Sequence, residues 1–271
     1  MLRFDANLTY LFQEVAFYER FERARQAGFT HVEFLNVFQF DLDQLRSAVN
    51  EAGLRIVQFN VLDGDMPAGE RGFASHPDQR TRWRAAIEQA LDIAAQLHPI
   101  QMHSLVGIVR ADLAPADQVA VLIENLHWAI PRLERAGIPL MLEPLNLADN
   151  PGYLISRIED AVDILQRVAS PWLRLQFDCY HVQRGQGDLL RRLTAAASHL
   201  GHVQIADNPG RGRPGSGEIN YRNVLAALER LGYDRYIGLE YRPAPDTLTA
   251  LDWLPHSARS AGCAAADLRL S

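Results

Sequence analysis

The chain has 271 residues, of which 48% are hydrophobic and 22% charged, so it is long and apolar enough to bury a sizeable core. Its 27 basic and 33 acidic residues give a net charge of −6, which does not supply the electropositive surface of a non-specific nucleic-acid binder. Two cysteines are too few for a disulfide scaffold. The first residues lack the pattern of a signal peptide, and no stretch approaches the ~18 apolar residues of a membrane span. We therefore expect a cytoplasmic protein that binds small molecules, and neither nucleic acid nor membranes.

Short apolar runs alternate with longer amphipathic segments along the chain, which is typical of βα units around a parallel sheet. The eight runs that we expect to form strands are Phe4–Leu8, His31–Leu35, Arg55–Val61, Ile100–Leu105, Pro139–Leu145, Leu173–Asp178, His202–Ala206 and Tyr236–Tyr241. Between two of them, apolar residues in Arg80–Leu97 recur at spacings of three and four, as on one face of a helix. Several such helices are followed by a glycine, the residue preferred at a left-handed helix C-terminus.

Eight units in 271 residues average about 34 residues each, close to the ~30 residues of one βα repeat. A doubly wound open sheet also alternates strands and helices, but no linker or change in composition divides this chain. We therefore predict one α/β domain, a single (β/α)8 TIM barrel over residues 1–271, with the last ~18 residues as a loose C-terminal extension. The longest loops follow strands three, four, five and seven, so function is expected at the carboxyl face.

A polar residue interrupts each of the last four apolar strands: Glu143, Asp178, Gln204 and Glu240. A carboxylate inside a buried strand costs several kcal/mol unless it is paired, hydrogen-bonded or bound to a metal. Three carboxylates and one amide oxygen suit a hard divalent ion such as Mg²⁺ or Mn²⁺. The alternative is a set of salt bridges or hydrogen bonds that fill the barrel core. We favour the metal site.

Several segments resemble the hydroxypyruvate isomerase family of the xylose-isomerase-like TIM barrels. They are FDANLTYLF, HVEFL, GDMPAGERG, MHSLVG, LEPLN, QFDCYHVQ, HVQIAD, GEINY and GLEYRP, and the resemblance extends to about Trp253. It implies that Glu143, Asp178, Gln204 and Glu240 hold a divalent metal and that Glu143 and Glu240 transfer protons. The related ketose 3-epimerases usually have histidine in place of Gln204, so this residue favours the keto-acid isomerases.

Four further residues are candidates for substrate binding. His181 follows Asp178 by three residues, and His103 follows the fourth strand. Arg211 lies in the glycine-rich loop after the seventh strand, where its guanidinium would clamp a substrate carboxylate. Glu70 lies in the long loop after the third strand, which could close as a lid. An ordinary loop or surface role is the alternative for each, whereas His202 is expected to form a hydrogen bond in the core.

These residues indicate an enzyme that moves a proton between neighbouring carbons of an α-hydroxy carbonyl compound through an ene-diolate. The predicted reaction converts hydroxypyruvate into tartronate semialdehyde. The alternatives are a 2-oxo-tetronate isomerase or a ketose 3-epimerase using the same site. A metal-dependent nuclease ranks lower, because the chain is acidic and the four-residue set is rich in oxygen donors. A non-catalytic sugar-binding barrel is the remaining alternative and also ranks lower. A homo-oligomer is a further expectation that the sequence leaves open.

Overall fold

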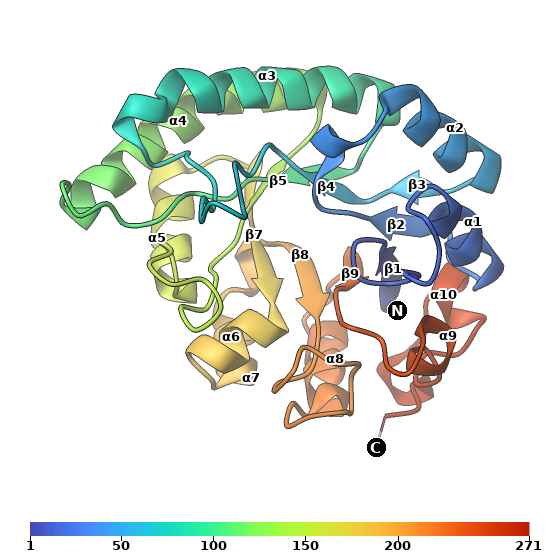
Figure 1. Cartoon of the computed structure of the whole chain (residues 1–271). Coiled ribbons are helices and arrows are strands. Elements are labelled where there is room, and N and C mark those ends of the chain that lie inside the picture. The colour runs from blue at the N-terminus through green and yellow to red at the C-terminus, as the bar shows by residue number, and fades with distance from the viewer. Residues whose placement is uncertain (271) are drawn as a thin grey trace.

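The computed structural model describes residues 1–270, and the strands of this range form one parallel sheet. The strands are β1 (Arg3–Asn7), β2 (His31–Glu33), β3 (Arg55–Ile56), β4 (Gln58–Asn60), β5 (Gln101–His103), β6 (Leu140–Leu142), β7 (Leu173–Asp178), β8 (Leu200–Ile205) and β9 (Tyr236–Leu239). They surround a common axis, and the helices lie outside them (Figure 1). The predicted TIM barrel is confirmed.

The third predicted strand is interrupted at Val57, and this residue closes the barrel. β3 pairs with β2, whereas β4 pairs with β5, so the two halves of one strand stand at the two ends of the sheet order. Across the interruption, the Val57 amide donates to the Val32 carbonyl at 2.7 Å, and the Gln101 amide donates to the Val57 carbonyl at 3.0 Å. These bonds continue the ladder and close the sheet into a barrel. Because the strands are parallel, their carboxyl ends all lie on one side of the barrel.

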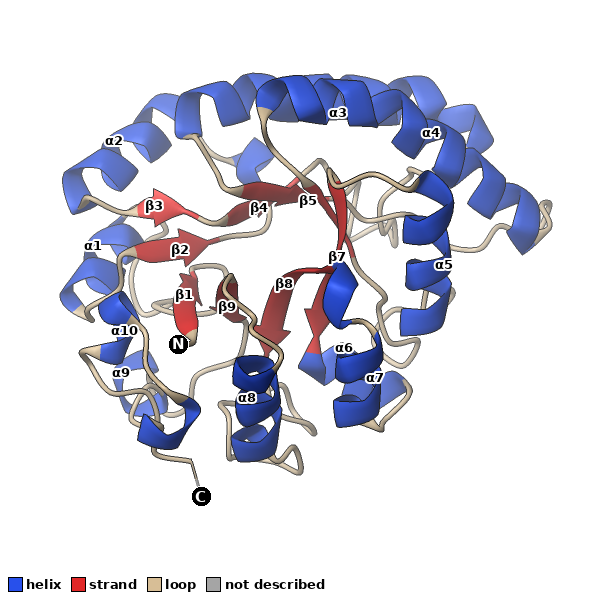
Figure 2. Ribbon diagram, turned by 180° about the vertical axis from the view of Figure 1, so that it is seen from behind, coloured by secondary structure: helices blue, strands red, loops and turns tan. Residues whose placement is uncertain are grey.

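The helices form an outer layer (Figure 2). The longer ones are α1 (Glu19–Gln26), α2 (Leu42–Ala52), α3 (Arg80–Leu97), α4 (Pro115–Ala136), α5 (Ile158–Val168), α6 (Cys179–Gly185), α7 (Leu189–Ala195) and α8 (Tyr221–Arg230). The short helices are α9 (Thr247–Ala250) and α10 (Ala258–Ala261), with 3-10 turns at η1 (Val37–Gln39), η2 (Pro77–Gln79), η3 (Ala197–His199) and η4 (Ala265–Asp267).

Local sequence explains where these helices pack and end. In α3, Trp83, Ile87 and Ala90 are buried along one face, as their spacing predicts. Gly53 and Gly137 end α2 and α4 with φ of 62° and 70°, a conformation that glycine adopts without strain. Within residues 1–270, no helix combines the length and apolar character needed to cross a membrane.

The C-terminal segment differs from the expected loose extension, because it packs against the barrel. Leu2 and Cys263 form an antiparallel bridge, and the Arg269 amide donates to the Trp253 carbonyl at 2.9 Å. Leu268 and Leu270 are buried. The segment has no apolar stripe of its own, so its order comes from contacts with distant residues that periodicity does not show.

We predict that Leu268→Ala lowers the free energy of unfolding by about 2–4 kcal/mol, since it removes a buried side chain and leaves a cavity. Leu268 is 6% exposed, whereas Leu248 is 61% exposed, so Leu248→Ala is the matched control and should change stability by no more than ~0.5 kcal/mol. Urea denaturation measures both. Equal effects of the two substitutions would show that the C-terminal segment adds nothing to the fold.

Candidate functional site

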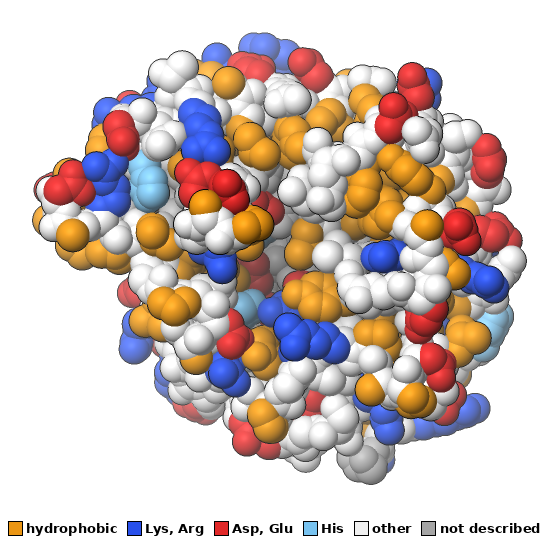
Figure 3. Space-filling view, in the orientation of Figure 1, with side chains coloured by type: hydrophobic (Ala, Val, Ile, Leu, Met, Phe, Trp, Pro, Cys, Tyr) orange, Lys and Arg blue, Asp and Glu red, His pale blue; other side chains and the backbone are white. Residues whose placement is uncertain are grey.

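A cavity of about 620 Å³ opens at the carboxyl ends of the strands. Its walls come from strand ends and from the loops after β1, β4, β6 and β8, and helix α6 completes them. Basic and acidic side chains border a hollow near the middle of this face (Figure 3). Three of the four long loops expected to carry function, those after the third, fifth and seventh predicted strands, therefore line one cavity.

Three of the four predicted metal ligands are buried carboxylates at or next to this cavity. Glu143 directly follows β6, Asp178 ends β7, and Glu240 directly follows β9. Burial raises the pKa of Glu143 well above its usual value, and the charges of Asp178 and Glu240 raise it further. Burial likewise raises the pKa of Glu240 to about 8 and that of Asp178 above its usual value, although Arg211 opposes both shifts. The barrel therefore crowds acidic groups into a dry space where full ionisation is costly.

Arg211 lies among these carboxylates. Its Nη2 donates to Glu240 Oε1 at 2.6 Å and to Asp178 Oδ2 at 3.1 Å. The guanidinium also lies over the rings of Tyr10 and Tyr180, at 5.1 and 5.0 Å from their centroids. The loop after β8 thus delivers a cation that neutralises part of the buried negative charge.

His181, in α6, is held beside the carboxylates as a neutral imidazole. The Asn146 backbone amide donates to its Nδ1 at 3.2 Å, and its Nε2 lies 3.6 Å from Asp178 Oδ2. Burial and the nearby Arg211 charge lower its pKa well below the usual value. Glu143, Asp178 and His181 each offer a ligand atom within 4.8 Å of the others. His181 therefore joins the candidate metal-binding group.

His103, at the end of β5, faces the same cavity. Its Nε2 lies 3.4 Å from Glu143 Oε2, and its Nδ1 lies 3.2 Å from Asn60 Oδ1. Burial lowers its pKa to about 3. This imidazole is also neutral at pH 7 and stands where a ligand beside Glu143 would touch it.

Gln204 is held by other polar side chains inside the barrel and does not line the cavity. Its Oε1 accepts from Gln176 Nε2 at 2.7 Å, and its Nε2 donates to Glu33 Oε1 at 2.8 Å. The chain of amides continues, because Gln58 donates to Gln176 and Gln101 donates to Gln58. An amide oxygen accepts two hydrogen bonds, so Gln204 Oε1 retains one lone pair for another partner.

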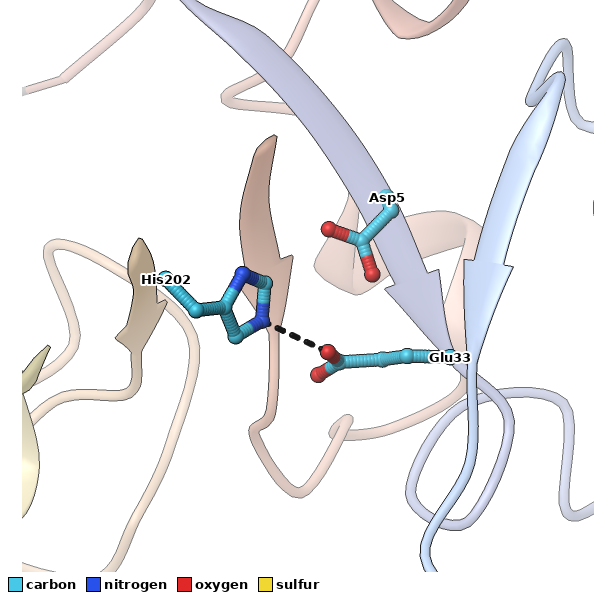
Figure 4. A group of neighbouring side chains, drawn as sticks. All are labelled: Asp5, Glu33 and His202. Atoms are coloured by element: carbon cyan, nitrogen blue, oxygen red, sulfur yellow. Dashed lines mark hydrogen bonds and ion pairs between the residues drawn. The ribbon is translucent and has the colours of Figure 1, made fainter. Parts of the chain in front are cut away.

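Glu33 also joins a second buried group at the interior end of this amide chain (Figure 4). His202 Nε2 lies 2.7 Å from Glu33 Oε2, which confirms the predicted core role of His202. The Asp5 carboxyl points toward the same two residues, and burial and the Glu33 charge raise its pKa well above the usual value. A proton retained by Asp5 lets this group form a compact core beneath the cavity.

Glu70 lies away from the other predicted site residues. Its carboxylate pairs with Arg82, with Nη1–Oε1 and Nη2–Oε2 distances of 2.8 and 3.0 Å. Its neighbour Arg71 lines the cavity and donates to Asn150 Oδ1 at 3.2 Å. A charged pair in a loop does not reveal which member faces inward, since this depends on how the loop folds back.

The sequence analysis missed other polar residues of the cavity. Arg184 and Arg242 line it together with Arg71 and Arg211, so four guanidinium groups surround one space. Asn60 and Asp63 also line it. Asn60 lies near the end of the third predicted strand and Asp63 just after it, so the position at a strand end that singled out Glu143 also points to these two.

The donor set fits a hard divalent cation. Glu143 and Asp178 offer carboxylate oxygens within 4.8 Å of each other, and Glu240 is joined to Asp178 through Arg211. Carboxylate oxygens are the ligands that Mg²⁺ and Mn²⁺ prefer. A cation would relieve the mutual repulsion that raises the pKa of these acids.

Comparisons with known proteins agree with this architecture. A profile of the xylose isomerase-like TIM barrel family matches residues 21–256. The chain is 38% identical to a 2-oxo-tetronate isomerase of Cupriavidus necator and 38% identical to a hydroxypyruvate isomerase of Escherichia coli; each match covers 94% of this chain and 98% of the relative. A crystal structure described as a family 2 AP endonuclease from Brucella melitensis is 38% identical, with a TM-score of 0.90 over 93% of this chain and 98% of that one. The chain belongs to the xylose isomerase-like TIM barrels and, within them, to the family of the hydroxypyruvate and 2-oxo-tetronate isomerases.

Proposed function

We propose that the protein is an isomerase of small hydroxy-keto acids that interconverts hydroxypyruvate and tartronate semialdehyde. The observation that carries this proposal is the arrangement of Glu143, Asp178 and Glu240 about a cavity bordered by four arginines. Buried carboxylates supply proton transfer, and arginines supply recognition of an acidic substrate. The names of the two relatives describe the same class of reaction.

A divalent cation, Mg²⁺ or Mn²⁺, is proposed to be held by Glu143, Asp178 and Glu240, with the Oε1 of Gln204 as a fourth ligand. When bound, such an ion stabilises negative charge that develops on the substrate oxygens. Hydrogen bonds with Gln176 and Glu33 orient the Gln204 amide, so that its oxygen faces Gln176 and its nitrogen faces Glu33. This orienting contact is typical of side chains that support metal ligands.

Glu143 and Glu240 are the proposed acid–base groups. They directly follow β6 and β9, which stand at different places around the barrel, so a substrate between them is flanked by both. A raised pKa brings a carboxyl group closer to the working pH, at which it can both take up and return a proton. The proton leaves the carbon that bears the hydroxyl group and returns to the neighbouring carbon.

The remaining polar groups are proposed to orient the substrate. His181 and His103 are neutral imidazoles that can form hydrogen bonds with its oxygens, and Arg211 is the proposed partner of its carboxylate. Arg71 lines the cavity and has no carboxylate partner among the described residues, so it is a second cation for that role. Glu70 stays a predicted lid contact, which would reach substrate only if its loop moved.

Chain length is the main alternative within this function. A 2-oxo-tetronate has one more carbon than hydroxypyruvate, and a relative of each name is equally similar to this chain. A ketose 3-epimerase would use the same carboxylates on an uncharged sugar. A comparison of kcat/KM for three-, four- and six-carbon substrates distinguishes them, and preference for a free ketohexose would contradict the keto-acid proposal.

A nuclease is the second candidate, because the similar structure from Brucella melitensis is described as an AP endonuclease. The net charge of −6 opposes it. Cleavage of abasic DNA by the purified protein with Mn²⁺ would support it. A sugar-binding barrel without catalysis is excluded once the wild-type protein turns over any substrate. Cytoplasmic location and a homo-oligomer stay predictions.

We predict that the purified protein, given hydroxypyruvate and Mn²⁺ in D₂O, incorporates solvent deuterium at the carbon that gains or loses the proton. The reason is that a carboxyl group that shuttles a proton exchanges it with solvent during turnover. Proton and deuterium NMR of the products measures the incorporation. Absence of exchange with every keto acid of two to four carbons would contradict the proposed reaction.

We also predict that substitutions of the two glutamates and of Gln204 in the four-residue set differ in their effects. Glu143→Gln and Glu240→Gln should each lower kcat by at least ~10²-fold at every Mn²⁺ concentration, because an amide cannot carry the proton. Gln204→Ala should weaken metal binding and recover part of its activity in excess Mn²⁺. Titration of kcat against Mn²⁺ separates the two classes. Full recovery of both glutamate variants would assign proton transfer to another group, first of all His181.

A further inference from the structure

Three residues beside the carboxylates form a hydrogen-bonded chain, of which the proposed function uses only the last, His103. Asn60 Nδ2 donates to Asp63 Oδ2 at 3.0 Å, and Asn60 Oδ1 lies 3.2 Å from His103 Nδ1. All three side chains are buried and line the cavity. The chain ends at His103 Nε2, which faces Glu143 Oε2 at 3.4 Å.

This chain fixes the position of the imidazole proton. A carboxylate only accepts hydrogen bonds, so Asp63 requires the NH₂ side of the Asn60 amide. The oxygen side of the amide then faces His103, and the hydrogen of that contact must come from Nδ1. A neutral imidazole carries one ring hydrogen, so Nε2 presents a lone pair.

That lone pair is left without a donor. His103 is 2% exposed, and its Nε2 has no hydrogen-bond partner among the described residues. An ionised carboxylate only accepts hydrogen bonds, so the two atoms do not satisfy each other when Glu143 carries its negative charge, as it would beside a bound cation. An unsatisfied buried acceptor destabilises the site, and a ligand hydroxyl placed beside Glu143 would satisfy it.

We propose that Asp63 and Asn60 are positioning residues that hold His103 in the Nδ1–H tautomer, so that Nε2 accepts a hydrogen bond from a hydroxyl group of the substrate. The inference rests on the proposed function for the identity of that substrate. It orients the molecule in the cavity, with its hydroxylated carbon toward His103 and Glu143 and its acid group toward the arginines. It also makes the site selective for hydroxylated acids over their deoxy analogues.

The alternative is the opposite orientation of the Asn60 amide, with the other tautomer of His103. If Asp63 were protonated, it could donate to Asn60 Oδ1, the amide would turn over, and His103 Nε2–H would point at Glu143. Burial raises the pKa of Asp63 to about 7. Measurements at pH 8, where Asp63 is mostly ionised, therefore test the arrangement that the structure shows.

The first experiment reads the tautomer directly in the protein with Mg²⁺ and without substrate, since a cation beside Glu143 favours its ionised form. Long-range ¹H–¹⁵N correlation spectra of ¹⁵N-histidine-labelled protein distinguish Nδ1–H from Nε2–H, and His103→Gln assigns the signal. We expect Nδ1–H in the wild type and Nε2–H in Asn60→Leu, in which the Glu143 carboxylate is the remaining acceptor. Gln101→Leu, a buried change on the same strand that leaves the chain of three residues intact, should keep Nδ1–H.

Asp63→Asn is the second variant if Asn60→Leu does not fold. Its amide can face either side of Asn60, so the Nδ1–H tautomer should lose population. Nε2–H in the wild type at pH 8, or unchanged Nδ1–H in both variants, would overturn the proposed positioning. Neither result depends on catalysis, so a failure of the proposed reaction would not be mistaken for a failure of this inference.

The second experiment tests hydroxyl recognition with glycerate and lactate, which differ by one hydroxyl group. With Mn²⁺ present, calorimetric titration of the wild type should favour glycerate by about tenfold, the size expected of one well-placed hydrogen bond. The preference should fall toward one in Asn60→Leu and remain in Gln101→Leu. An equal preference in the wild type and Asn60→Leu would overturn the assigned role of His103 Nε2.

Discussion

The repulsion among Glu143, Asp178 and Glu240 is the constraint on which the rest of the site depends. All three residues are at most 5% exposed, so water screens their carboxyl groups little. Two like charges about 5 Å apart repel by roughly 3 kcal/mol even at an effective dielectric constant of about 20. A fold that keeps them together must supply compensating charge, hydrogen bonds or protons.

The barrel supplies these in separate layers. Arg211 brings one positive charge from the loop after β8, and the Tyr180 amide donates to Asp178 Oδ1 at 2.8 Å. Toward the interior, each glutamine amide in a row donates a hydrogen bond to the next, and the last one donates to Glu33. Glycine at position 238 leaves room for Glu33, since a Cβ there would lie 2.4 Å from its Oε1. The cavity floor is therefore polar and buried, and the carboxylates that a cation would neutralise lie above it at the carboxyl ends of the strands.

Much of the fold could be predicted from the sequence. Strand and helix positions followed from periodicity, because each strand is a short apolar run and each helix has an apolar face. The burial of Glu143, Asp178 and Glu240 at strand ends followed from the parallel barrel. The local pattern did not show the closure at Val57 or the packing of Leu268, since both depend on contacts between distant parts of the chain.

The candidate site was predicted less completely than the fold. Asn60, near the end of the third predicted strand, and Asp63, just after it, were overlooked because only the last four strands were searched for polar residues at their ends. The sequence could not show which of Glu70 and Arg71 faces the cavity, because a loop has no periodicity that shows which side chain points inward. The partners of Gln204 were also beyond prediction, since each amide in its chain comes from a different strand.

The most direct measurement is thermal unfolding at increasing Mn²⁺ concentration for the wild type and Asp178→Asn, with Asp112→Asn as an exposed control. A cation that binds among the carboxylates stabilises the folded state, by about 2.7 kcal/mol at a hundred times its Kd. We expect Mn²⁺ to raise the Tm of the wild type and of Asp112→Asn, with little effect on Asp178→Asn. Equal stabilisation of all three proteins, or of none, would contradict the claim that this cluster is built around a divalent cation.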